Sequence, residues 1–64
     1  MTITKITHAY IRTYSDSGQT TAYVEWVDTK GESGRTEGDP NGLHMTALLN
    51  RAVRENVTIQ REQW

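Results

Sequence analysis

The 64-residue chain has no cysteine, no phenylalanine and only one proline. The absence of cysteine excludes disulfide bonds, and two histidines alone offer too few ligands for a structural zinc ion. No apolar stretch approaches the roughly 18 residues of a membrane-spanning helix. Neither sign of charge is in large excess, because the net charge is only −1. We therefore predict no metal, no cofactor and no membrane partner, and the whole chain has no basic field that would attract nucleic acid.

The length of the chain predicts a single small domain over residues 1–64. A domain of this size buries only about 60% of the surface of its unfolded chain, so its core is marginal. A second copy or a partner protein is the usual additional support for such a domain. The first residues, Met1 to Lys5, lack the apolar stretch of a signal peptide. We therefore expect a cytoplasmic protein that forms a homo-oligomer or binds a protein partner.

A first β-hairpin is predicted around the sequence Asp16-Ser17-Gly18-Gln19, which separates two runs rich in tyrosine, threonine, valine and isoleucine. A two-residue turn at Ser17-Gly18 would place Ile11 opposite Val24. In this register one face of the hairpin is apolar and the other carries the tyrosines. The apolar face consists of Ala9, Ile11, Val24 and Trp26, and the second face carries Tyr10, Tyr14 and Tyr23.

A second hairpin is predicted at Asp28-Thr29-Lys30-Gly31, where aspartate suits the first position of a type I turn and glycine suits a left-handed position. A three-residue loop would place Asp28 opposite Glu32, and Glu25 beside Arg35 on the tyrosine face as an opposite-charge pair. A two-residue loop would instead bring charged residues of the third strand to the apolar face. We therefore adopt the three-residue loop, which makes the third strand a short, polar edge strand.

A helix is expected over Leu43–Glu55. Its apolar stripe at helical spacing consists of Met45, Leu48, Leu49, Ala52 and Val53. Asp39 can cap the helix with Pro40 as the first helical residue, and Asn41 is the other candidate cap. Asn56 suits a left-handed residue that ends the helix.

A last strand is expected after the helix, because Val57 and Ile59 alternate with Thr58 and Gln60 up to about Trp64. The helix carries the chain back across the sheet, so a right-handed crossover places this strand parallel to the first strand and beside it. The predicted fold is α+β, with element order β-β-β-α-β, a four-stranded mixed sheet of order 3-2-1-4, and one helix packed on one face. By alternation, Trp64 joins the tyrosines on the face without a helix.

This strand order, with a helix after a three-strand meander, resembles the first half of the ribonuclease H-like fold. Enzymes of that fold hold two metal ions with carboxylates on the first strand, the first helix and the fourth strand. Here the middle of the first strand reads His8-Ala9-Tyr10-Ile11-Arg12, the helix offers Thr46 and Asn50, and the last strand offers only Glu62 near its end. No set of nucleophile and base can be assembled either, so we expect no enzymatic activity.

The face without a helix is the candidate functional surface. Tyrosine, tryptophan and arginine are favoured anchors of protein interfaces, and charged neighbours set orientation. The sequence therefore predicts a non-catalytic protein-binding module, such as a small inhibitor, adaptor or accessory factor, which binds a partner or its own copy. The residues predicted to bind the partner are Tyr10, Arg12, Tyr14, Tyr23, Glu25, Arg35 and Trp64.

Two alternatives use the same surface. Single-stranded nucleic acid could stack on the aromatic rings, with Arg12 and Arg35 near its phosphates. Glu25, Glu37 and Glu62 share this face and disfavour that partner. The other alternative is that the tyrosines have no partner and are present only because tyrosine favours strands.

Overall fold

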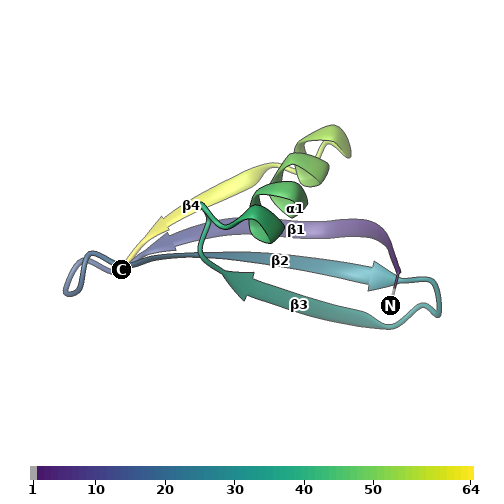
Figure 1. The fold of residues 1–64 in the computed structure, drawn as a ribbon, viewed down its shortest axis with the longest axis horizontal. Helices are drawn as coiled ribbons and strands as arrows, with labels where there is room; N and C mark the ends of the chain where they lie inside the picture. Colours follow the sequence, from purple (N-terminus) through teal and green to yellow (C-terminus); the bar gives the residue numbers. More distant parts are fainter. Residues whose placement is uncertain (1) are drawn as a thin grey trace.

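The computed structural model describes residues 2–64 as a mixed β-sheet with one helix lying across one of its faces (Figure 1). The elements are β1 (Ile3–Thr13), β2 (Thr20–Asp28), β3 (Ser33–Gly38), α1 (Leu43–Arg54) and β4 (Ile59–Gln63). The strand order is β3-β2-β1-β4, with β4 parallel to β1, which confirms the predicted α+β fold and its topology. Within residues 2–64, no helix combines the length and the apolar character needed to cross a membrane.

The first hairpin has a longer turn than the sequence predicted. The N–H of Tyr14 donates to the carbonyl of Gln19 at 2.8 Å, which closes a four-residue loop instead of a two-residue turn. As a result Val24 lies opposite Ala9 rather than opposite Ile11, so the predicted register was wrong by two residues. Side chains alternate with a period of two, and the shift therefore left every assignment to a face unchanged.

The second hairpin has the predicted register. The N–H of Asp28 donates to the carbonyl of Glu32 at 2.9 Å, and Gly31 takes the left-handed conformation with φ of 80°. The Asp28 carboxylate also accepts the N–H of Glu32 at 2.9 Å, which fixes the turn. Glu25 consequently lies beside Arg35, as expected from the three-residue loop.

The first half of β1 contains a bulge that the sequence pattern did not indicate. The register with β2 shifts between Ile6 and His8, which leaves Thr7 as an extra residue. Ile6 and Ala9 are an odd number of residues apart, yet the bulge allows both to be buried under α1. A strand without the bulge would have turned one of these two side chains to the other face.

β4 pairs only with residues 9–13 of β1. The end of α1 bonds to the part of β1 that precedes them. The N–H of Ile6 donates to Oε1 of Glu55, and Nη2 of Arg51 donates to the carbonyl of Ile3, both at 2.8 Å. Arg51 and Glu55 also form an ion pair at 2.6 Å. These two side chains satisfy backbone groups that a neighbouring strand would otherwise satisfy.

The bounds of α1 agree with the prediction to within one residue, whereas its N-terminal capping differs. The N-cap is Gly42, and no side chain caps the helix. Oδ1 of Asp39 accepts the N–H of Asn41 at 2.9 Å, so both predicted caps form a turn before the helix, and Pro40 is not helical. The Asp39 side chain is thus used locally before the helix begins. Asn56 has the expected left-handed conformation, with φ of 63°.

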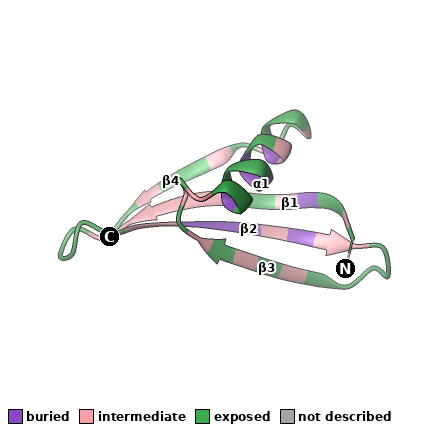
Figure 2. Cartoon of the chain, viewed as in Figure 1, coloured by how far each residue is buried: buried purple, intermediate pink, exposed green. Residues whose placement is uncertain are grey.

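The hydrophobic core lies between α1 and the strands beneath it (Figure 2). Its buried residues are Ile6, Ala9, Ala22, Val24, Trp26, Met45, Leu48, Leu49 and Ala52. Val53, which the helical stripe had assigned to the core, is 60% exposed. It lies one helical step of about 100° beyond Ala52, on the side turned to solvent. In the described part of the chain, no helix covers the opposite face of the sheet.

Candidate interaction face

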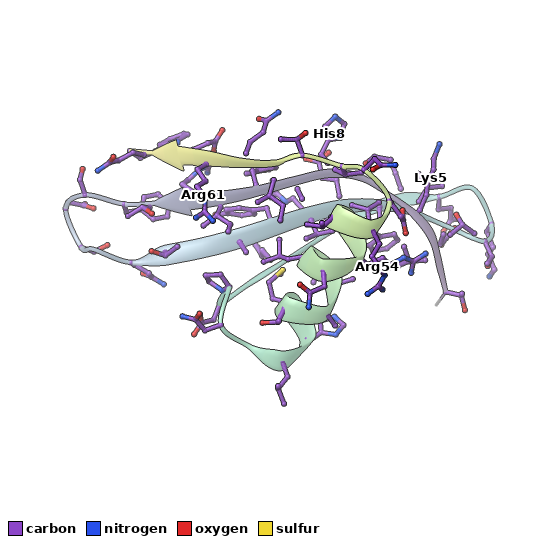
Figure 3. All side chains as sticks on the ribbon, turned by 90° about the horizontal axis from the view of Figure 1, so that it is seen from above. Lys5, His8, Arg54 and Arg61 are labelled. Atoms are coloured by element: carbon purple, nitrogen blue, oxygen red, sulfur yellow. The ribbon has the colours of Figure 1, made fainter. Side chains whose placement is uncertain are left out.

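The side of the sheet opposite α1 carries all the residues that the sequence assigned to partner binding, and we call it the open face. Figure 3 shows His8 projecting from this side, away from the helix. Strand pairing places Tyr10 opposite Tyr23, Glu25 opposite Arg35, and Arg12 opposite Glu62 of β4. The structure therefore brings the predicted residues together on one surface.

The tyrosines of the open face cover one another. The rings of Tyr10 and Tyr23 stack with centroids 5.0 Å apart and an interplanar angle of 19°. Tyr23 is consequently only 7% exposed, and Tyr10 and Tyr14 are half-buried. Trp64 remains 62% exposed. The expectation of an uncovered aromatic surface is thus wrong for Tyr23, because neighbouring side chains on the same face pack over its ring.

Arg12 is the centre of this packing. Its Cζ atom lies 4.1 Å from the ring centroid of Trp64 and 5.1 Å from that of Tyr23. Its Nε atom donates to Oε1 of Glu62 at 3.0 Å, and Nη1 donates to the hydroxyl of Tyr14 at 3.5 Å. A planar guanidinium can stack on rings by its faces and donate hydrogen bonds from its edge at the same time. Arg12 therefore fixes the positions of groups on both β1 and β4.

The hydroxyls of Tyr14 and Tyr23 lie 3.2 Å apart and influence each other's ionisation. The hydrogen bond from Tyr23, assisted by Arg12, lowers the pKa of Tyr14 below its usual value of 10.0. The same contact raises the pKa of Tyr23, which would lose its donor role on ionising. Hydrogen bonds to Tyr14 and Glu62 raise the pKa of Arg12, which keeps this guanidinium charged.

Glu25 and Arg35 are neighbours in register, but their side chains turn to other groups. Oε1 of Glu25 lies 3.4 Å from Nδ1 of His8, and Oε2 accepts the Tyr10 hydroxyl at 3.5 Å. The Cζ atom of Arg35 lies 5.3 Å from the ring centroid of Tyr23, and the Tyr10 hydroxyl raises the pKa of Arg35. Within residues 2–64, Glu25 and Arg35 form no ion pair with each other.

Trp64 is held beside the hairpin by its backbone as well as by Arg12. Its N–H donates to the carbonyl of Thr13 at 2.8 Å, and its carbonyl accepts the N–H of Ser15 at 2.7 Å. The indole meets the ring of Tyr14 edge to face, with centroids 6.3 Å apart and an angle of 60°. This position confirms that Trp64 belongs to the tyrosine face, as the alternation of the last strand had predicted.

The open face also carries Glu37, Glu62 and His8, which the list of predicted binding residues omitted. The sequence had already placed Glu62 on this face, and the parallel register of β4 with β1 sets it beside Arg12. His8 alternates with Tyr10 along β1 and therefore shares its face, and the bulge at Thr7 sets it opposite Glu25. His8 and Glu62 line a shallow depression of about 480 Å³ between β1 and the segment before β4.

The chemical groups of the open face are aromatic rings, two guanidiniums and several carboxylates. Within residues 2–64, no three histidine, aspartate or glutamate side chains gather in a way that could hold a metal ion. Comparison with protein-family models, curated proteins and solved structures gave no match for this chain. A function for the open face therefore rests on its geometry and its chemistry.

Proposed function

We propose that this protein is a non-catalytic binding module that recognises another protein through the open face. The observation that carries the proposal is the packed set of rings around Arg12 on a sheet surface with no helix over it. Aromatic residues and arginine contribute most strongly to protein interfaces. Side chains that are already held in place lose less conformational entropy on binding.

The residues of the open face would have different roles in such an interface. Trp64 is 62% exposed and is the main apolar anchor, while Tyr10 and Tyr14 offer partly exposed rings beside it. Arg12 and Glu25 present charged groups that set the orientation of the partner. Tyr23 supports the other rings from below and makes little direct contact.

A protein partner fits this face better than single-stranded nucleic acid does. Stacking on bases requires a free ring face, but Tyr23 is buried beneath its neighbours, and Arg12 covers one face of Trp64. Glu37 and Glu62 add negative charge that would repel phosphates. A mixed surface of rings and both charges is instead typical of protein contacts.

The proposal can be tested by affinity capture from the native host with matched variants. We expect the wild type to capture a specific protein that Trp64→Ala fails to capture. The captured protein, once purified, should bind the wild type directly. Leu43→Ser is the control, because Leu43 is 92% exposed on the helix, away from the open face. Capture that survives Trp64→Ala and Tyr10→Ser unchanged would contradict the proposal.

A titration with labelled single-stranded oligonucleotides at two salt concentrations distinguishes nucleic-acid binding by the open face from protein binding. We expect no binding at low salt. Binding that weakens steeply as salt is raised, and that is lost with Arg12→Ala, would instead assign the open face to nucleic acid.

A further inference from the structure

The outer edge of β3 presents a row of unpaired backbone groups. β3 is the last strand on its side of the sheet, and no other element of residues 2–64 lies beside it (Figure 1). Residues of an antiparallel strand alternately bond to the partner strand and point away from it. The bond between Asp28 and Glu32 fixes this alternation. The N–H and C=O groups of Ser33, Arg35 and Glu37 therefore point outward, where another strand could pair with them.

Few features of β3 protect this edge. The strand Ser33–Gly38 contains no proline and no lysine, and its register with β2 has no bulge. Its only charged residues are Arg35 and Glu37, which have opposite signs, lie two positions apart and are both exposed. Their outward backbone groups and their complementary charges together make the β3 edge complementary to the β3 edge of a second copy.

The β4 edge does not have this property. Both backbone groups of Trp64 bond towards the β1 side, to Thr13 and Ser15, so by alternation those of Arg61 point outward. By the same alternation Ile59 and Gln63 point outward and are uncharged, so no register of two antiparallel β4 strands sets opposite charges against each other at this edge, and the register centred on Arg61 would oppose two like charges. The two edges of the sheet thus differ in their capacity for self-pairing.

We infer that a second copy of this chain pairs antiparallel along β3, in the register centred on Thr36. Arg35 of each copy then lies opposite Glu37 of the other, and the two Thr36 side chains face each other, which are both favourable cross-strand pairs. The neighbouring registers with the same bonding pattern would oppose Arg35 to Arg35, or Glu37 to Glu37. Arg35 can remain stacked on Tyr23, because the edge of its guanidinium is still free to donate.

This dimer would join the two sheets into one continuous sheet. The two-fold axis is perpendicular to the sheet, so both helices lie on one side and both open faces lie on the other. The inference goes beyond the proposed function, since it leaves the open face accessible and presents it twice to a partner. Two linked sites raise the apparent affinity for a partner with two matching sites.

Exchange of the two charges provides the first test, by sedimentation velocity over a range of concentrations. We expect a dimer for the wild type, and a dissociation constant raised about tenfold or more by Arg35→Glu alone or by Glu37→Arg alone. The double variant Arg35→Glu/Glu37→Arg restores opposite charges in both pairs and should recover the dimer. A wild type that stays monomeric, or a double variant no better than the single ones, would overturn the inference.

Proline substitution tests the backbone contribution independently. Glu37→Pro removes an outward N–H without removing a bond to β2, and it should give a folded monomer. Arg61→Pro makes the same change on the β4 edge and should leave the dimer intact. The opposite result would assign the dimer to β4. Trp64→Ala should also leave the dimer intact, and its loss in that variant would mean that self-association uses the open face instead.

Discussion

The indole ring of Trp26 lies directly over Gly34 on the neighbouring strand. A β-carbon at Gly34 would come within 2.5 Å of Cη2 and 2.6 Å of Cζ2 of this ring. The ring cannot move aside freely, because its Nε1 atom donates to Oγ1 of Thr36 at 2.9 Å. Packing against Trp26, rather than an unusual backbone conformation, therefore requires glycine at this position.

We expect Gly34→Ala to lower the free energy of unfolding by about 1–3 kcal/mol, the usual cost of overpacking a core. The matched control is Gly38→Ala on the same strand, where the nearest atom to the added carbon, Met45 Cε, is 3.9 Å away. The control should be neutral or slightly stabilising, because alanine restricts the unfolded chain. Urea denaturation measures both effects, and equal stability of the two variants would refute the steric explanation.

The stability of the protein should depend on pH through Glu55. The N–H of Ile6, followed by Arg51, favours the charged carboxylate and lowers the pKa of Glu55 below its usual value of 4.5. This stabilisation is complete above the pKa of the unfolded chain and is lost as the pH falls through the lower pKa of the folded protein.

We therefore expect Glu55→Gln to be less stable than the wild type near neutral pH. The difference in unfolding free energy should shrink as the pH falls below about 4.5. Urea denaturation over a series of pH values measures this difference. Glu32→Gln, in the exposed turn between β2 and β3, is the control for loss of a carboxylate. A difference that is independent of pH would show that the charge of Glu55 is unimportant.

Tyr14 should ionise at a lower pH than an isolated tyrosine, because its phenolate can accept a hydrogen bond from the Tyr23 hydroxyl, which lies 3.2 Å away. Tyr23→Phe removes this donor and keeps the ring, so we expect the pKa of Tyr14 to rise towards its usual value. NMR of isotope-labelled tyrosine rings follows each ionisation separately. Tyr10→Phe removes a hydroxyl that bonds to Glu25 instead and serves as the control. The same Tyr14 pKa in both variants would contradict the proposed donor.

Alternation of side chains was sufficient to predict the fold. The length of the first turn was wrong, but an error of two residues keeps Val24 on the apolar face and Tyr23 on the open face. An error of one residue would have exchanged the faces. The second hairpin was more accurate because Asp28 and Gly31 have strong turn preferences that fix a single register.

The packing of the open face could not be predicted in the same way. Alternation identifies which residues share a face, but it does not indicate that Arg12 stacks on Trp64 or that Tyr23 becomes buried. Those contacts depend on rotamers and on the twist of the sheet. The bonds from Arg51 and Glu55 to β1 were missed for a related reason, since they join residues remote in sequence.

The bonds between Trp64 and the first hairpin also influence the order of folding. Ser15 and Trp64 are 49 residues apart in the chain, and the entropy of closing so long a loop must be lost before β4 can pair with β1. The β1–β2 and β2–β3 hairpins connect neighbouring segments and can form earlier. Until β4 is in place, one side of β1 lacks a partner strand, so docking of the last strand removes this edge from contact with other chains.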